Sequence, residues 1–159
     1  MTFLPQVQHA LAALPLFSSG GQLLAVSDGG LELRCELAAL DTLACSFERI
    51  ALRADRLAGN TPAQLKQVAE KLSQRLTYLL EPISPIEFDA QGCTVQMRSN
   101  PPRKDEDGTS YYELLVSHSG ELSLCRYMRP PGGMRSIIPA HVTREVLLRI
   151  VDDFVAVTS

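Results

Sequence analysis

A seven-residue alternation of apolar and charged side chains at 31–37 constrains the fold of this sequence more than any other feature. The segment reads LELRCEL, with apolar residues at the odd positions and charged residues at the even positions. Successive side chains of a β-strand point to opposite faces of its sheet. The pattern therefore predicts a strand with one buried face and one solvent-facing face. A sheet with one covered side and one open side follows from it.

A second segment, 61–80, has the spacing of an amphipathic helix. Asn60 or Thr61 is suited to cap it. Pro62 fits its first turn, and Pro82 follows its end. We expect its apolar residues to form one buried stripe, with its long polar residues in water. The stripe comprises Leu65, Val68, Ala69, Leu72, Leu76, Leu79 and Leu80.

Two further helices are predicted near the ends of the sequence. The first spans 2–14, with Thr2 as its cap and Pro15 at its end. The last spans about 140–156 and directs a second apolar stripe inward. That stripe comprises Val142, Val146, Leu147, Ile150, Val151, Phe154 and Val155. The polar arc of the same helix comprises His141, Glu145, Arg149, Asp152 and Asp153.

Strand-like segments occupy most of the remaining sequence. A hairpin is predicted between 22–27 and 30–38, because Asp28-Gly29 is a dipeptide typical of two-residue turns. The later strands are expected at 85–89, 93–99, 110–117 and 121–128, with a polar loop at 100–109 and a Pro/Gly-containing linker at 129–139.

The alternation changes phase inside the third strand. Leu43 and Phe47 share one parity and are expected to face inward together, whereas Ile50 and Leu52 occupy the other parity. An extra residue in one strand of a pair produces such a shift. We therefore expect a β-bulge near Glu48.

The predicted order is helix, three strands, helix, four strands, helix. Strands grouped between single helices favour an α+β fold with an antiparallel sheet, because parallel neighbours need a crossover between each pair. We expect one domain over 1–159, with three helices and about six to seven strands. A sequence of 159 residues is long enough to bury a substantial core.

Composition excludes several classes of protein. The net charge of −3 argues against a general nucleic-acid binder, which needs a basic surplus. No apolar run approaches the roughly 20 residues of a membrane-spanning helix. No Lys or Arg precedes Arg34, so the charged start of a secretory signal is missing. We expect a cytoplasmic protein that contacts neither nucleic acid nor membrane.

The cysteines form no Cys-x-x-Cys pair, although structural zinc sites usually place their ligands in such close pairs. Three of the four lie inside strand-like segments, where a thiol packs as a small apolar group. We expect all four to be reduced and to bind no metal. They are Cys35, Cys45, Cys93 and Cys125.

No catalytic or cofactor motif is present in the sequence. His9, His118 and His141 accompany no Gly-x-Ser-x-Gly turn, and 141–145 lacks the second histidine of a zinc-protease motif. His118, at the tip of a predicted hairpin, is a candidate base, and a solvated turn residue is the alternative. The acidic residues at 105–107 lack the spacing of a calcium loop. We predict no cofactor and favour a non-enzymatic protein.

One charge pattern suggests a binding surface. Arg126, Arg129 and Arg135 lie in a stretch from 122 to 143 that contains no Asp or Glu, although the whole chain is acidic. Clustered arginines on a loop can bind carboxylate or phosphate groups in bidentate fashion. Alternatively, they pair with acids of neighbouring elements or remain in water. We take these arginines and His118 as the candidate binding residues.

The element order, length and charge of the sequence resemble those of the type III secretion chaperone class. The resemblance covers the element order of most of the sequence but no diagnostic motif. It implies a homodimer whose sheet surface holds an extended segment of an effector protein. Four strands after the central helix, instead of two, depart from that class, and Asp28-Gly29 matches its Asp-x-x-Gly turn only loosely.

Two functions follow from these observations. The first is a chaperone-like module that holds a protein segment on a sheet face or edge, with self-association as a homodimer as a further expectation. The second is a small ligand-binding domain or enzyme, with an anionic ligand near the Arg126–Arg135 segment. The absence of an acid/base or metal-ligand motif favours the first. An exposed apolar patch would support the first, and an enclosed polar pocket with these arginines would support the second.

Overall fold

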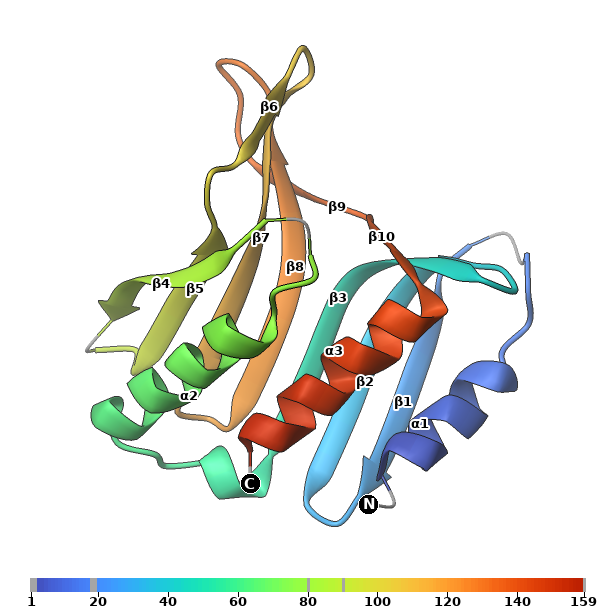
Figure 1. The fold of residues 1–159 in the computed structure, drawn as a ribbon, viewed down its shortest axis with the longest axis horizontal. Helices are drawn as coiled ribbons and strands as arrows, with labels where there is room; N and C mark the ends of the chain where they lie inside the picture. The colour runs from blue at the N-terminus through green and yellow to red at the C-terminus, as the bar shows by residue number, and fades with distance from the viewer. Residues whose placement is uncertain (1–2, 18–19, 80, 90, 159) are drawn as a thin grey trace.

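The computed structural model describes residues 3–17, 20–79, 81–89 and 91–158 (Figure 1). The predicted cap at Thr2 lies outside these residues. The elements in chain order are α1 (Phe3–Ala12), β1 (Gln22–Asp28), β2 (Leu31–Leu40), β3 (Ala44–Ala54), the 3-10 helix η1 (Asp55–Leu57), α2 (Pro62–Arg75), β4 (Ile83–Asp89), β5 (Thr94–Ser99), β6 (Arg103–Asp105), β7 (Gly108–Ser117), β8 (Glu121–Arg129), β9 (Ser136–Ile138), β10 (Ala140–Thr143) and α3 (Arg144–Val157).

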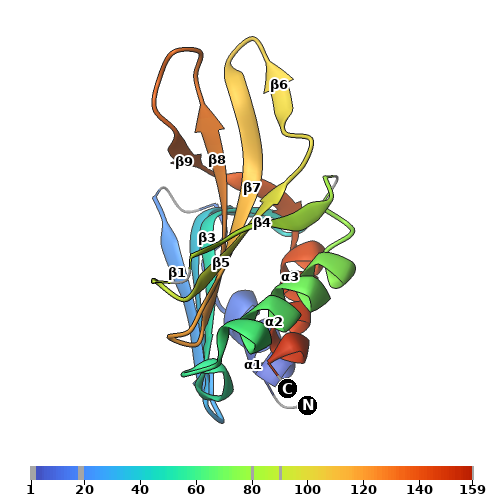
Figure 2. The same cartoon turned by 90° about the vertical axis from the view of Figure 1, so that its left-hand side faces the viewer.

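An antiparallel sheet runs through the molecule in the order β1-β2-β3-β8-β7-β5-β4. The short strands β10, β6 and β9 pair with β3, β7 and β8, respectively. All three α-helices lie on one side of the sheet, and the other side is uncovered (Figure 2). The predicted α+β fold with three helices and an antiparallel sheet is confirmed. The three short strands were not predicted, because three- and four-residue strands leave almost no periodic signal.

The β1–β2 hairpin and the β3 bulge follow the sequence pattern. The two turn residues are Gly29 and Gly30, both at positive φ, so the turn lies one residue later than predicted. In the β2–β3 pair, Glu36 lies opposite Arg49, and Leu37 lies opposite Phe47. Glu48 is therefore an unpaired extra residue, and the predicted bulge is confirmed.

Helix α2 begins as predicted and ends early. Thr61 caps it in a capping box with Gln64, in which each side chain bonds to the other residue's backbone N–H. The helix stops at Arg75, although Leu76 and Leu79 remain buried. The segment beyond the helix brings the Tyr78 hydroxyl to within 2.6 Å of the Asp153 carboxylate on α3.

The predicted start of the last helix, at 140, is wrong. Residues 140–143 form β10, which pairs with 44–47 of β3. The helix begins at Arg144, and the Thr143 side chain accepts a hydrogen bond from the Val146 N–H. A threonine cap satisfies this N–H, and the extended segment before it gains sheet hydrogen bonds. Asp153, predicted in the polar arc, is buried against Tyr78.

The core lies between the helices and the covered face of the sheet. Leu72 and Leu76 have no exposed surface, as predicted, and α1 contributes Phe3, Val7 and Leu11. Two further predictions are wrong. Leu43 is 78% exposed, because it lies in the tight turn between β2 and β3 and not in the strand. The polar loop at 100–109 contains β6, which forms a hairpin with β7.

Among the described residues, no helix is long and apolar enough to cross a membrane.

Candidate functional site

The four predicted binding residues do not form one site. Arg126 and Arg129 lie in the second half of β8, whereas His118 lies in the turn that precedes the strand. At about 3.3 Å per residue, the strand separates His118 from Arg126 by on the order of 20 Å. His118 is exposed. Its backbone carbonyl accepts a hydrogen bond from the Gly59 N–H at 2.8 Å, and this contact does not involve the imidazole.

Arg126 points to the helix-covered side of the sheet. Its guanidinium donates to Glu81 Oε2 at 2.9 Å and to Ser110 Oγ at 3.0 Å, and it stacks on the Tyr112 ring at 4.7 Å. Only 13% of the Arg126 side chain and 16% of the Glu81 side chain are exposed. Because the two side chains form a buried ion pair, Glu81 compensates the charge of Arg126. Burial is also the largest of the effects that raise the pKa of Tyr112.

Arg135 lies on the open side of the sheet, against the Glu113 carboxylate. Its guanidinium donates to both carboxylate oxygens at 3.1 Å and to the Tyr111 hydroxyl at 3.2 Å, and it stacks on the Tyr127 ring at 4.0 Å. Its hydrogen bonds to Tyr111 and Glu113 raise the pKa of Arg135. Arg98 forms a second ion pair with Glu113, at 3.8 Å.

These contacts form a cluster on the open side of the sheet whose members bind one another. Its residues are Arg98, Tyr111, Glu113, Tyr127 and Arg135. The Glu113 side chain is 3% exposed although it faces the uncovered side of the sheet, because the two arginines and Gln96 surround it. Tyr111 and Tyr127 stack with ring centroids 6.1 Å apart. Such a cluster holds the loop that carries Arg135 against the sheet. The Arg129 side chain, by contrast, is exposed, and its Nε donates to the Gly133 carbonyl at 3.3 Å.

Sequence reasoning missed the acidic partners of the arginines. Glu113 is one charged residue inside the apolar run YYELLV, which is a usable signal because an isolated acid in a buried strand needs a partner. No pattern indicated Glu81, which lies after the end of α2.

The outer edge of β1 offers a different kind of surface. Among the described strands, β1 pairs with β2 alone. Its register with β2 has no bulge, and the two-residue turn makes Asp28 and Leu31 a hydrogen-bonded pair. Hydrogen bonding alternates along the strand, so the backbone groups of Leu23, Ala25 and Ser27 point away from β2. These groups are oriented to pair with a further strand.

The strand itself and the sequence before it carry almost no charge, although Glu32, Arg34 and Glu36 of β2 lie opposite Ser27, Ala25 and Leu23. The first 31 residues contain one charged side chain, Asp28, although 21% of the whole sequence is charged. Leu23, Leu16, Phe17 and Leu43 are 43%, 39%, 76% and 78% exposed. The Phe17 N–H donates to the Leu40 carbonyl at 3.0 Å, which places Phe17 near the turn that contains Leu43. Helix α1 lies alongside this edge (Figure 1). An apolar corner therefore adjoins the unpaired strand edge.

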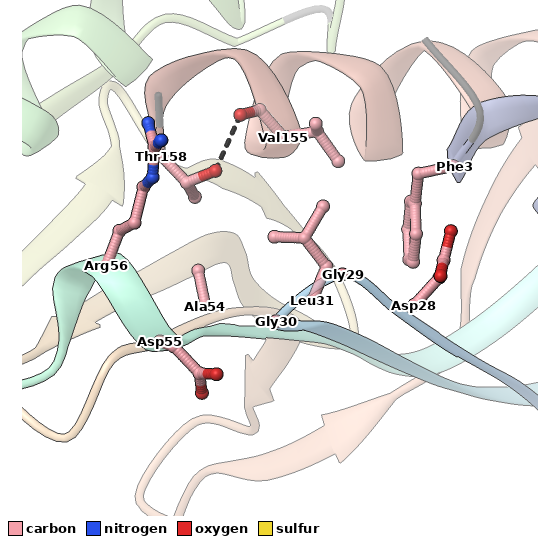
Figure 3. A pocket seen from close by; sticks show the side chains of 10 residues that line it. All are labelled: Phe3, Asp28, Gly29, Gly30, Leu31, Ala54, Asp55, Arg56, Val155 and Thr158. Carbon is pink, nitrogen blue, oxygen red and sulfur yellow. Dashed lines mark hydrogen bonds between the residues drawn. The ribbon is translucent and has the colours of Figure 1, made fainter.

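A pocket of about 280 Å³ lies at the other end of β1 (Figure 3). Asp28, Asp55 and Arg56 contribute charged groups, and Phe3 contributes an apolar wall. The Thr158 hydroxyl, which also lines the pocket, donates to its own helix. The lining residues that the structure describes include no His or Cys.

Burial dominates the surroundings of the cysteines, although Cys45 lies near Arg144 and Cys125 lies near Arg49. Cys35, Cys45 and Cys125 are buried, and Cys93 is half-buried. Burial is the main cause that raises the pKa of Cys45 to about 11, and burial raises that of Cys35 as well. Thiols in such surroundings are poor nucleophiles. Among the described residues, no three His, Cys, Asp or Glu side chains are grouped to hold a metal ion.

Comparison of the sequence with protein-family models and with curated proteins, and of the fold with solved structures, found no match.

Proposed function

We propose that this chain is a non-enzymatic, chaperone-like protein-binding module that holds an extended segment of another protein along β1. The observation that carries the proposal is the regular, uncharged and unpaired edge of β1. An edge strand with free backbone groups is a template for pairing with another chain, and proteins usually blunt it with charge, proline or a bulge. None of these features is present in β1 between Gln22 and Ser27.

The surroundings of the edge support a protein segment as the ligand. Interface cores are depleted of charged residues and enriched in aromatic side chains. The 76% exposed Phe17 ring and the 78% exposed Leu43 side chain offer apolar contacts beside the strand. Backbone pairing would supply affinity, and these side chains would select apolar residues in the bound segment.

The proposal includes a cytoplasmic location. Cys35, Cys45 and Cys125 are thiols rather than disulfides, which is the usual state of cysteines in a reducing compartment.

Site-specific photo-cross-linking in the native cells tests the proposal. A photoreactive amino acid at Leu23 reports on the β1 edge, and the same residue at the exposed Glu87 of β4 is the matched control. We expect a partner to be captured from position 23 and not from position 87. The substitution Ala25→Pro should abolish that capture, because it removes an outward-pointing N–H while leaving the β1–β2 hydrogen bonds intact.

Three results would contradict the proposal. Equal capture from positions 23 and 87 would show that the β1 edge is not selective. Unchanged capture by the Ala25→Pro protein, with its folding verified by circular dichroism, would show that backbone pairing is not involved. Capture of a second copy alone would replace the partner protein with self-association.

A further inference from the structure

A second site, separate from the β1 edge, lies above Arg126 on the helix-covered side of the sheet. It is a groove of about 700 Å³, within the range of small-molecule sites. The groove is lined by segments that are far apart in the sequence, from Leu79 and Glu81 after α2 to Pro139 and His141 around β10. The arm formed by β6 and β7 borders it.

The floor and walls of the groove differ in polarity. The Arg126–Glu81 ion pair and the Tyr112 ring lie at its floor, and all three residues are largely buried. The walls are mostly apolar and rigid, with three prolines among them. The apolar lining residues other than Tyr112 are Leu79, Pro101, Pro102, Met128, Ile138 and Pro139. A flat apolar body fits such walls.

The two members of the ion pair at the floor differ in how many of their polar atoms form hydrogen bonds. Arg126 uses its two terminal nitrogens on Glu81 and Ser110 and one face on Tyr112. Glu81 uses Oε2 on Arg126, but its Oε1 is buried and has no hydrogen-bond partner among the described residues. A buried carboxylate oxygen without a donor costs free energy. This oxygen has almost no solvent-accessible surface, so Glu81 contributes negative charge beneath the groove and not an open acceptor.

The charges at the rim act in the same direction. Asp105 and Asp107 line the groove together with Arg103, which lies 3.9 Å from Asp105. With Glu81 and Arg126 included, the lining carries three acids and two arginines, and it also contains His141. A ligand cation is favoured by this sum, and an anion is opposed.

We propose that this groove binds a small, flat organic cation of the amidine or guanidine class, with its apolar body between the proline walls and its charge towards Glu81 and the rim aspartates. The expectation of an anionic ligand near Arg126, drawn from the sequence, is opposed by the same charges. Arg126 acts as a positioning residue that holds the Glu81 carboxylate.

Three probes of one shape and different charge test the proposal. Benzamidine, benzamide and benzoate share a phenyl ring and carry positive, zero and negative charge. Titration of the isotope-labelled protein, followed by NMR, should show saturable shifts at Met128 and Tyr112 with benzamidine and none with benzoate at equal concentration. Saturable benzoate shifts at these residues, or benzamidine shifts confined to other residues, would overturn the proposal.

Variants assign the binding to the groove. Glu81→Gln should weaken benzamidine binding about tenfold or more. Because this variant leaves Arg126 buried without its partner, the exposed double variant Asp105→Asn/Asp107→Asn provides a test that does not depend on the core. We expect it to weaken binding by about twofold or more.

The matched control is Asp152→Asn, which removes one exposed acid from α3, away from the groove lining. It should leave benzamidine affinity unchanged. If Asp152→Asn weakens binding as much as Asp105→Asn/Asp107→Asn does, benzamidine is attracted only by the net charge of the protein. That result would contradict the proposed binding site.

Discussion

The two edges of the sheet are built in opposite ways. The β4 edge contains Pro85, a register shift between Pro85 and Glu87, and the acidic residues Glu87 and Asp89. Each of these discourages a further strand from pairing. The β1 edge has the same length, seven residues, but keeps an unbroken register with β2 and ends in its one charge, Asp28.

The difference shows that protection of an edge is not a general requirement of this fold. The same chain blocks one edge with proline, a bulge and charge, and leaves the other open beside exposed apolar side chains. An unprotected edge is an aggregation hazard, so its retention at β1 is a reason to assign it a binding role.

The largest effect that sharpens this comparison concerns the two faces of β1. Leu24 is 1% exposed under the helices, whereas its neighbour Leu23 is 43% exposed. We expect Leu24→Ala to lower the free energy of unfolding by about 2–5 kcal/mol. Leu23→Ala should cost under about 0.5 kcal/mol. Chemical denaturation of both variants measures this, and equal losses would show that Leu23 also serves stability.

Proline substitutions test which backbone groups of β1 are free. Val26→Pro removes an N–H that bonds to β2 and leaves the partner carbonyl unpaired, so it should cost clearly more than Ala25→Pro. Ala25→Pro removes an outward N–H and should cost on the order of 1 kcal/mol. Thermal and denaturant melts of the two variants compare them directly. If Ala25→Pro proves the more costly, the hydrogen-bonding alternation assigned to β1 is inverted.

Thiol reactivity compares burial in the two halves of the sheet. Cys93, in the turn between β4 and β5, is half-buried, whereas Cys35, in β2 beside β1, is fully buried. We expect Cys93 to react first with a disulfide reagent at pH 8, and all four thiols to react after unfolding without reductant. Fewer than four would reveal a disulfide.

The raised pKa of Cys45, about 11, adds a pH dependence to the same experiment. A thiol whose pKa is higher in the folded state than in the unfolded state favours folding while it is protonated. Its contribution is therefore complete below about pH 9 and is lost as the pH rises towards 11. The reactivity of Cys45 at pH 9 should remain well below that of a small-molecule thiol.

The smallest effect is in backbone amide exchange. Along β1, the amides of Leu24 and Val26 should exchange slowly, and those of Leu23 and Ala25 quickly, because only the former bond to β2. Residue-resolved hydrogen exchange by NMR measures this alternation. A bound partner strand should slow the fast set and leave the slow set unchanged.

The elements with strong periodicity were predictable from the sequence. The alternation at 31–37, the stripe of α2 and the phase change at Glu48 all correspond to structure, because each reflects burial that repeats over several residues. The strand β10 was predicted as helix, since Val142 lies four residues before Val146 and continues the apolar spacing of the helix that begins after it. Local pattern cannot show a four-residue pairing with β3.

The candidate binding surfaces were less predictable than the fold. The arginines were found by their lack of local acids, but their partners Glu81 and Glu113 come from other elements. Only the tertiary fold shows that Arg126 and Arg135 lie on opposite sides of the sheet. The lack of charged residues within β1 and before it was readable in the sequence, and its importance depends on β1 being an edge strand.

The central pairing of the sheet, between β3 and β8, has a consequence for the order of folding. Ile50 pairs with Leu124, so the two halves of the sheet join through residues far apart in the chain. Such pairings close long loops and slow folding. During synthesis from the N-terminus, the β1–β3 sheet emerges well before β8 and exposes β3 as an additional unpaired strand. The nascent chain is thus most vulnerable to mispairing in that interval, and translation speed over the intervening residues becomes a determinant of yield.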